Sequence, residues 1–417
     1  MEQRKLYKTL ENAIKRFPDF ENDLELLSYV LKEIIHHENI DIIGGRLWML
    51  NDTRTAYSMV EQHGDIEKIR RGYMLKLDSY PVFYEVGRNR SLLAQETDKY
   101  LSNIGIHTYS ATGIGDRFKT KDKEGKEQLV YQYILAFNSQ EMNIGLLHTL
   151  NIISTTVSSM LRTRRMEKKA RAIEKDLEKA REIQKSILPE HEYTFGNYEI
   201  FGISVPDKIV GGDFFDYMTF GRESDKMGIA IGDAASKGFS AAAQALYVSG
   251  ALKMGTESDI TMTSVMKKIN NLVYRVFPYE RFLTLFYMMV FKDFKGLCLF
   301  INAGHNPPFH LSYSTNNIEL LNSTGSVLGP APEQEYYTDS FNIEKNDVVL
   351  LYTDGIVEAT DSKFQFYGED RLKEILINNK NFSSKEIAES VIEDVQKYST
   401  KGKYSDDRTV VVIKRVQ

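Results

Sequence analysis

The sequence lacks the features that define several large classes of protein. It contains one cysteine, Cys298, so a disulfide framework within the chain and a zinc site built on thiolates are both excluded. Its net charge of −5 leaves no basic surplus for general binding to nucleic-acid phosphates. The least charged stretch, residues 142–161, is interrupted by His148 and Asn151, so we expect no membrane span. No apolar segment follows the first residues as in a secretory signal, which predicts a cytoplasmic protein.

The remaining composition is that of an ordinary globular chain with more than one domain. Apolar residues make up 42% and charged residues 27% of the 417 positions, which is enough to bury a sizeable core. A chain of this length is expected to form two or three domains. The composition changes near residue 161, and Pro189 ends the segment that begins there. We therefore predict an N-terminal domain over residues 1–160, a helical linker over 161–189 and a C-terminal domain over 190–417.

The linker segment has the pattern of a coiled coil. Residues 161–188 are rich in Glu, Lys, Arg and Ala and contain no glycine or proline. One interpretation of this segment is a single amphipathic helix that packs on its own domain. We favour a parallel dimer, because the apolar seam is narrow and charged residues fill its flanks. The seam residues alternate at spacings of four and three: Met166, Ala170, Ile173, Leu177, Ala180, Gln184 and Ile187.

The N-terminal part alternates helix and strand signals. Residues 22–36 have the pattern of an amphipathic helix, and residues 41–50, 55–62 and 128–137 are β-prone runs bounded by polar turns. This layout resembles a GAF domain, a small sensory α/β module with a central antiparallel sheet. A PAS-like module is the nearest alternative. The overall fold class that we expect is therefore multidomain α+β.

In the C-terminal part, short strands dominate and two helices are inserted among them. The helices are predicted at residues 240–255 and 262–277, and a third at 383–398 begins with a capping box formed by Ser383 and Glu386. Strands are predicted at residues 282–291, 297–302, 308–312, 348–352 and 409–414.

Four acidic segments carry most of the functional information. They are Gly211-Gly212-Asp213, Ile231-Gly232-Asp233, Thr353-Asp354-Gly355 and Ser405-Asp406-Asp407. Aspartates beside glycines at strand ends can converge on one edge of a sheet. Carboxylates packed together repel strongly, so such a cluster requires a cation between them. Oxygen ligands suit Mg²⁺ or Mn²⁺ rather than zinc, which points to metal-assisted phosphate chemistry.

Five segments in this order resemble one family. They read VGGDFFDY, IGDAASKGFSAA, NAGHNPP, LLYTDGIVEATD and YSDDRTVVVI, and they resemble the PPM-type serine/threonine phosphatases, especially the bacterial SpoIIE/RsbU-like group. The resemblance covers roughly residues 189–417. It implies an α-β-β-α sandwich with two Mn²⁺ or Mg²⁺ ions at one end of the sheets. Such ions lower the pKa of bound water, so that hydroxide attacks the phosphorus in line.

The resemblance also implies which residues act. Asp213 and Asp233 correspond to the catalytic ligands that reach both metals, and only the first acid of the Asp406-Asp407 pair aligns with a family ligand. The implied metal ligands are Asp213, Asp233, the backbone carbonyl of Ala234, Asp354 and Asp406.

The chain departs from the eukaryotic members of the family. Those members carry a histidine shortly after the second aspartate as an acid for the leaving group, whereas residues 234–237 here read Ala-Ala-Ser-Lys. Lys237 or a water is a candidate for that role. His305 is a candidate for binding the substrate phosphate, but a polar turn that hydrogen-bonds locally is at least as good an interpretation.

Two other functions compete with the phosphatase. The segment GGDFF is similar to the signature of diguanylate cyclases, but Phe214 stands where that signature has an acid. A catalytically inactive dimeric scaffold is the second alternative, although four retained acids argue against it. By resemblance, the substrate is a phosphoserine or phosphothreonine protein such as an anti-sigma-factor antagonist with a STAS fold, dephosphorylated under control of the sensor domain.

Overall fold

The computed structural model describes residues 11, 15–36, 42–94, 103, 109–139, 144–220, 225–256, 260–278, 282–292, 295–399 and 406–416. Asp41, Tyr404 and Ser405, which belong to predicted segments, lie outside this set. The chain divides into two compact units, Met1–Ala172 and Ile173–Gln417. Each is described by itself. Among the residues described, no helix is both long and apolar enough to cross a membrane.

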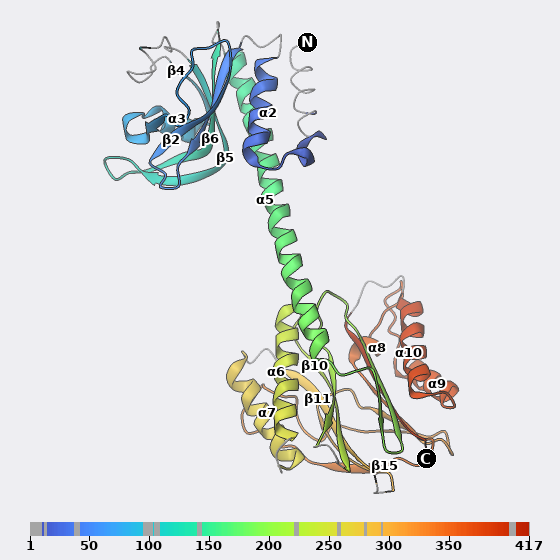
Figure 1. The fold of residues 1–417 in the computed structure, drawn as a ribbon. Helices are drawn as coiled ribbons and strands as arrows, with labels where there is room; N and C mark the ends of the chain where they lie inside the picture. Colours follow the sequence, from blue (N-terminus) through green and yellow to red (C-terminus); the bar gives the residue numbers. More distant parts are fainter. Residues whose placement is uncertain are drawn as a thin grey trace. The chain divides into compact units, whose positions relative to one another are not determined.

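The first unit is built on one antiparallel sheet (Figure 1). Its elements are η1 (Phe17–Asp19), α2 (Asp23–Ile35), β1 (Ile42–Leu50), β2 (Ala56–Gly64), β3 (Met74–Lys76), η2 (Leu77–Ser79), α3 (Val82–Asn89), β4 (Ser91–Ala94), β5 (Tyr109–Lys121), β6 (Glu127–Ser139) and the start of α5 (Ile144–Ile187). The six strands follow the order β3-β2-β1-β6-β5-β4. The helix expected at 22–36 and the strands expected at 41–50, 55–62 and 128–137 are therefore confirmed.

Two apolar layers cover the two faces of this sheet. On one face, side chains of α2 and α5 pack on β1 and β6, with Leu31, Leu150 and Phe137 fully buried. On the other face, α3 and the segment before it pack on Trp48, Ile134 and their neighbours. The helix α2 begins at a proper cap, because the Asn22 side chain accepts a hydrogen bond from the backbone N–H of Glu25.

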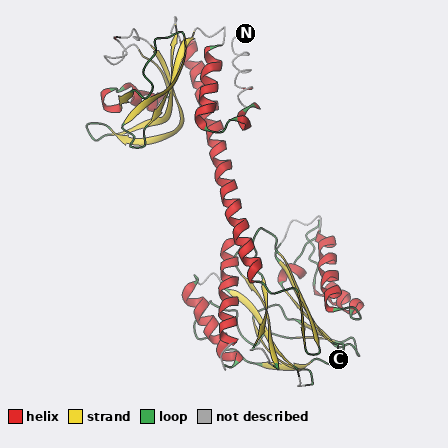
Figure 2. Ribbon diagram, in the orientation of Figure 1, coloured by secondary structure: helices red, strands yellow, loops and turns green. Residues whose placement is uncertain are grey.

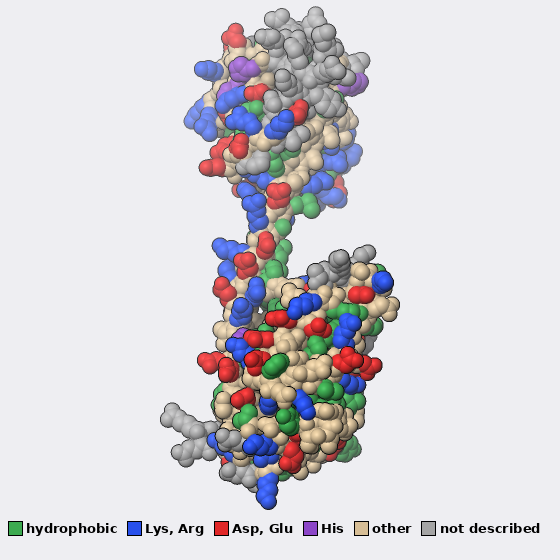
Figure 3. All heavy atoms as spheres, turned by 90° about the vertical axis from the view of Figure 1, so that its right-hand side faces the viewer, with side chains coloured by type: hydrophobic (Ala, Val, Ile, Leu, Met, Phe, Trp, Pro, Cys, Tyr) green, Lys and Arg blue, Asp and Glu red, His purple; other side chains and the backbone are tan. Residues whose placement is uncertain are grey.

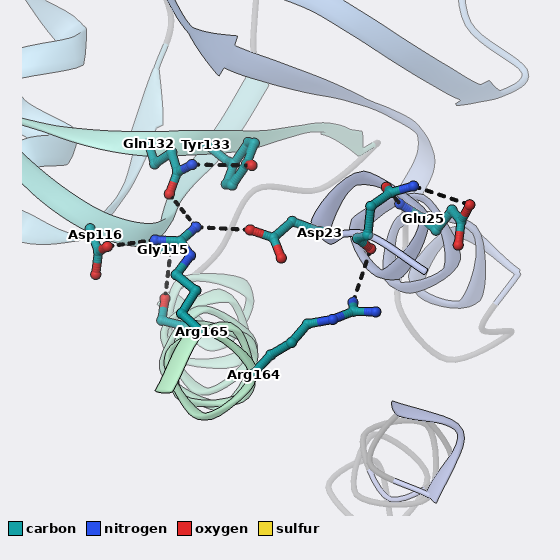
Figure 4. A network of polar contacts seen from close by, with 10 residues as sticks. Asp23, Glu25, Gly115, Asp116, Gln132, Tyr133, Arg164 and Arg165 are labelled. Carbon is teal, nitrogen blue, oxygen red and sulfur yellow. Dashed lines mark hydrogen bonds and ion pairs between the residues drawn. The ribbon is translucent and has the colours of Figure 1, made fainter. Parts of the chain in front are cut away.

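The contacts of α5 with the first unit continue beyond residue 160. Arg165 lies at the centre of a polar network, in which its guanidinium bonds to Asp23 and Asp116 and to the amide of Gln132 (Figure 4). The preceding residue, Arg164, donates to the backbone carbonyl of Asn22. The first unit therefore holds α5 at least as far as Arg165.

The second unit has four layers (Figure 2). Its elements are β7 (Glu192–Phe195), β8 (Tyr198–Val205), β9 (Phe214–Thr219), β10 (Lys226–Ala234), α6 (Phe239–Thr256), α7 (Met262–Val276), β11 (Leu283–Phe291), β12 (Leu297–Ala303), β13 (Phe309–Leu311), β14 (Ile318–Leu320), β15 (Asp339–Asn342), β16 (Val348–Tyr352), α8 (Asp354–Val357), α9 (Glu369–Asn379), α10 (Ser384–Ser399) and β17 (Arg408–Arg415). One sheet has the order β15-β12-β11-β10-β9 and the other β14-β13-β16-β17-β8-β7.

Three apolar cores hold these layers together. One lies between α6, α7 and the five-stranded sheet, a second lies between the two sheets, and a third lies between the six-stranded sheet and α9 with α10. Cys298 is buried in the middle core. The arrangement is the expected α-β-β-α sandwich. The capping box at Ser383 and Glu386 is also present, since each residue hydrogen-bonds to the other's backbone N–H.

The charges on the surface are mixed. On the face drawn in Figure 3, basic and acidic side chains are interspersed over both units. This distribution agrees with the small net charge of −5. The described residues on that face form no extended basic patch of the kind that nucleic-acid binding requires.

Candidate active site

Strand pairing brings the first two acidic segments together. Asp213 directly precedes β9, and Asp233 is the second-last residue of β10. The two strands pair with Phe214 opposite Gly232, so the two aspartates lie on neighbouring strands at the same end of the sheet. A side-chain hydrogen bond links Asp233 to Asp213. The predicted convergence of these two carboxyl groups is therefore present.

The third segment reaches the site from the other sheet. Strand β16 ends at Tyr352, Thr353 is the N-cap residue of the short helix α8, and Asp354 is its first residue. A Cβ atom on Gly355 would lie 2.0 Å from the backbone oxygen of Asp407. Only glycine permits so close an approach of α8 to the start of β17. This contact explains the glycine of the Thr-Asp-Gly segment and holds Asp354 beside the fourth acidic segment.

The two acids of the fourth segment have different roles. Asp407 accepts hydrogen bonds from the backbone N–H groups of Asp207, at 2.8 Å, and Gly212, at 2.6 Å. It therefore joins the loop that carries Asp213 to the six-stranded sheet. Asp406 instead forms an ion pair with Lys237, with 2.8 Å between Oδ2 and Nζ. Asp406 thus lies at the site, whereas Asp407 holds the loop that precedes Asp213.

Thr353 is a residue of the site that the sequence analysis missed. Its buried hydroxyl donates to Oδ2 of Asp213 at 2.7 Å and accepts the backbone N–H of Thr409 at 3.0 Å. One hydroxyl thus fixes the Asp213 carboxylate relative to β17. Its partner is 140 positions away in the sequence, so no local pattern could reveal it.

Burial and mutual repulsion raise the pKa values of the acids at the site. Burial, followed by the charge of Asp233, raises the pKa of Asp213 well above its usual value. Burial, followed by the charge of Asp354, raises the pKa of Asp233 to about 7. Burial, followed by Glu358 and Asp406, raises the pKa of Asp354 to about 6. At neutral pH these carboxylates destabilise one another, and a cation would relieve that repulsion.

The donor set fits hard divalent cations. The side chains that repel one another are carboxylates, and the backbone oxygen of Ala234 lies close to Gly212, 3.1 Å from where a Cβ on that glycine would stand. Such oxygen donors suit Mg²⁺ or Mn²⁺. Within the described ranges, however, no three His, Cys, Asp or Glu side chains gather closely enough to hold one ion as they stand. The chemistry of the donors therefore fits, while the side chains are spread more widely than a loaded site requires.

Lys237 and His305, the candidates for proton donation and phosphate binding, occupy different places. Lys237 lies at the rim of the site, where its half-exposed side chain pairs with Asp406. His305 is only 3% exposed, and its Nδ1 lies 2.9 Å from the hydroxyl of Thr284. Thr284 is the residue paired with Asp233 across β10 and β11. His305 thus supports the strand behind Asp233 and does not reach the surface where a substrate phosphate would bind.

Burial gives His305 a testable pH signature. It lowers the pKa of His305 to about 4, from an ordinary 6.5, so the neutral ring is favoured in the folded state. Its contribution to stability is complete above pH 6.5 and is lost as the pH falls toward 4. We expect the free energy of unfolding to fall by on the order of 3 kcal/mol from this residue between pH 7 and pH 4.

Urea unfolding at several pH values measures this contribution. The His305→Gln variant, which has no titrating ring, should lose the corresponding part of the acid sensitivity, although its stability at pH 7 is lower. Parallel stability–pH curves for the wild type and the variant between pH 7 and pH 4 would contradict a buried neutral histidine.

Gln184 departs from its predicted place in the coiled-coil seam. Its side chain is buried in the second unit, where its amide nitrogen donates to the backbone oxygen of Gly211 at 2.8 Å. Its amide oxygen accepts the N–H of the same glycine at 3.4 Å. Gln184 therefore packs on its own chain. Its contact secures the loop two residues before Asp213, which the heptad spacing could not reveal.

Comparison with known proteins finds relatives of the second unit. The family described as Stage II sporulation protein E (SpoIIE) matches residues 223–416, which include Asp233, Asp354 and Asp406. The phosphoserine phosphatase RsbU of Bacillus subtilis is 26% identical over 243 residues, which cover 58% of this chain and 71% of RsbU. The protein IcfG of Synechocystis is 26% identical over 344 residues, 76% of this chain but only 53% of IcfG.

A solved structure supports the fold. The SiaA-PP2C domain of Pseudomonas aeruginosa aligns with a TM-score of 0.50 at 18% identity, over 59% of this chain and 98% of that domain. The sandwich and the family match together overturn the diguanylate-cyclase alternative, because the GGDFF segment enters β9 of a sandwich built from two antiparallel sheets. Residues 223–416 of this chain are therefore similar to the SpoIIE family, and the second unit has a fold like that of the SiaA-PP2C domain.

Proposed function

We propose that the chain is a metal-dependent protein serine/threonine phosphatase of bacterial signalling. One observation carries the proposal: acidic residues from four separate segments meet where the ends of the two sheets join, and burial and mutual repulsion raise the pKa values of Asp213, Asp233 and Asp354. Such an arrangement destabilises the protein unless cations bind. The phosphatase activity of the relative RsbU supports the same reaction.

The ligands that we propose for two Mn²⁺ or Mg²⁺ ions are Asp213, Asp233, the carbonyl of Ala234, Asp354 and Asp406. When bound, the ions would supply Lewis-acid charge that activates water and offsets charge on the phosphoryl group.

The chain's own residues would prepare this site. Thr353 holds the Asp213 carboxylate in one orientation through its 2.7 Å hydrogen bond. Asp407 fixes the preceding loop through two backbone N–H groups. Lys237 offers a positive charge at the rim, beside Asp406, for an incoming anionic group. These fixed neighbours reduce the reorganisation that binding of ions and substrate requires.

The substrate that we propose is a phosphoserine or phosphothreonine protein, specifically an antagonist of an anti-sigma factor with a STAS fold. Incubation of the purified chain with a set of phosphorylated STAS proteins and Mn²⁺ tests this assignment. We expect phosphate release from at least one of them, and much slower release from an unrelated phosphoprotein. Equal rates on all phosphoproteins would contradict the STAS assignment, and no release from any would contradict the phosphatase itself. The inactive scaffold is the alternative in that second case.

We also propose that residues 1–160 form a GAF-like sensory module, 161–189 a coiled-coil linker of a homodimer, and 190–417 the phosphatase domain. The antiparallel sheet of the first unit, covered by helices on both faces, supports the sensory module. The exposed apolar side chains of Met166 and Ile173, seven residues apart on α5, support the seam.

Control of the phosphatase would pass along α5. This helix is continuous from Ile144 to Ile187, and Gln184 near its end holds Gly211, two residues before Asp213. A change in the helix pairing would therefore alter the loop that carries a proposed metal ligand. Such coupling requires a signal that binds two states of the helix with different affinity.

A further inference from the structure

A hollow lies on the sheet of the first unit, on the face opposite α2 and α5. Strand pairing sets Arg46 of β1 opposite Ala136 of β6, and Ala136 opposite Ala111 of β5. These three residues form one row across the centre of the sheet and share a face, because they are paired directly. Two alanines in such a row leave space that larger side chains would fill. The small residues thus form a floor, with an arginine at one side.

The walls of this hollow are mostly aromatic and aliphatic. Its remaining lining residues are Trp48, Ile69, Leu75, Tyr80, Val82, Phe83, Val86, Tyr109 and Ile134. About 490 Å³ is unfilled by protein atoms, part of it open to solvent. A flat ring fits such a space between aromatic walls better than a branched aliphatic group does.

Among the described residues that line the hollow, Arg46 is the one charged side chain. It is 3% exposed, its Nη1 donates to Oδ1 of Asn138 and its Nη2 to the backbone oxygen of Glu67, each at 2.7 Å. Its buried Nε has no hydrogen-bond partner in the described part of the chain, where the guanidinium also forms no ion pair. The exposed Glu67 acts on it only through space, and burial lowers the pKa of Arg46 to about 10, so it is still charged at neutral pH.

A buried guanidinium with an unused N–H is costly, because both its charge and its donor have lost water. Two neutral oxygens satisfy part of the group but do not neutralise it. An anionic acceptor placed at Nε would satisfy both needs through a charge-assisted hydrogen bond.

We propose that this hollow is a binding site for a small aromatic carboxylate, whose ring lies between the aromatic walls and whose carboxylate accepts a hydrogen bond from Arg46 Nε. The proposal concerns binding alone and does not depend on the phosphatase function. If the first unit has the sensory role proposed above, such a ligand would be its signal. If that role is wrong, the proposal of a binding site still stands.

The chain offers a built-in reporter for the test. Trp48, which lines the hollow, is the one tryptophan of the sequence. We expect benzoate, added to the full chain, to change its fluorescence saturably with a Kd of roughly 0.1–1 mM, as for a ligand of so few atoms. Benzamide, which has the same shape without the charge, should bind at least about tenfold more weakly.

Two variants separate the site from its surroundings. Ala136→Leu fills the floor and keeps every hydrogen bond of Arg46, so it should abolish the benzoate response. Arg46→Lys keeps the charge but removes Nε, so it should weaken binding at least about tenfold. Arg71→Lys, at an exposed arginine of the same unit, is the matched control and should bind as the wild type does.

Thermal unfolding by circular dichroism shows whether each variant is folded. If either variant does not fold, the comparison of benzoate with benzamide on the wild-type chain still tests the proposal. No saturable response to about 10 mM benzoate would overturn the proposal, since a site of this size and charge binds well below that concentration. Equal affinity for benzamide, or unchanged binding by a folded Ala136→Leu variant, would also overturn it.

Discussion

Replacement of Asp233 by asparagine should lower phosphate release by roughly 100-fold or more and, at the same time, stabilise the metal-free protein. Activity falls because the change removes a charge on which ion binding and transition-state stabilisation depend, with almost no change in volume. The stability effect follows from the pKa of Asp233, which burial and then the charge of Asp354 raise from 3.8 to about 7.

The direction of the stability effect depends on pH. A carboxyl group whose pKa is raised in the folded state favours the protonated form, so ionisation weakens the fold as the pH rises from about 4 through 7. The Asp233→Asn variant should therefore match the wild type near pH 4 and exceed its free energy of unfolding by on the order of a few kcal/mol at pH 8. Urea unfolding in the presence of a chelator measures this difference.

Asp216→Asn is the matched control for that experiment. Asp216 lies only three residues after Asp213, but its buried carboxylate pairs with Lys253 at 3.0 Å and accepts the hydroxyl of Ser249 at 2.7 Å. We expect this variant to keep phosphate release near the wild-type rate. Wild-type turnover by Asp233→Asn, or a lower stability of that variant at pH 8, would contradict the role assigned to Asp233.

Introduction of glutamate at both Ile173 and Leu177 should convert a dimer into monomers. Ile173 is 62% exposed within one chain, so an apolar side chain there gains by packing against a second helix. Two glutamates in that seam would face their counterparts in the partner helix, where burial of like charges is strongly unfavourable. Light scattering measures the mass. Because we propose that sensor control passes along α5, the rate on a protein substrate should change as well.

A control pair separates the seam from general effects of charge. Ala172→Glu with Lys179→Glu places two glutamates at exposed positions outside the predicted seam, and this double variant should remain a dimer. A dimer that survives the Ile173 and Leu177 changes would mean that the interface lies elsewhere, and the linker would then be no coiled coil.

Where local pattern and tertiary packing agree, the elements could be predicted from the sequence. The helix at Asp23–Ile35 has both a cap and an apolar stripe, and its predicted bounds were right within one residue. By contrast, β5 at Tyr109–Lys121 contains two glycines and several charged residues. It is a strand because β4 and β6 pair with it on either side, and pairing between distant segments leaves no local periodic signal.

The same limit applies to the site. The acids could be found because three of the four segments place an aspartate beside glycine, and because they occur with the NAGHNPP segment in the order of one family. Their supporting residues could not, because Thr353 meets Asp213 and Gln184 meets Gly211 only after the sheets and α5 have packed. Gln184 also shows how a heptad pattern misleads: its spacing fits the seam, while its hydrogen bonds hold it to its own chain.

The rate of phosphate release from a phosphoserine protein, measured with the full chain over a series of Mn²⁺ concentrations, tests the central claim most directly. We predict no measurable release in excess chelator and a rate that rises saturably with Mn²⁺, with Mg²⁺ as an alternative ion. A rate that is the same in chelator and in saturating Mn²⁺ would contradict a metal-dependent phosphatase built on Asp213, Asp233, Asp354 and Asp406.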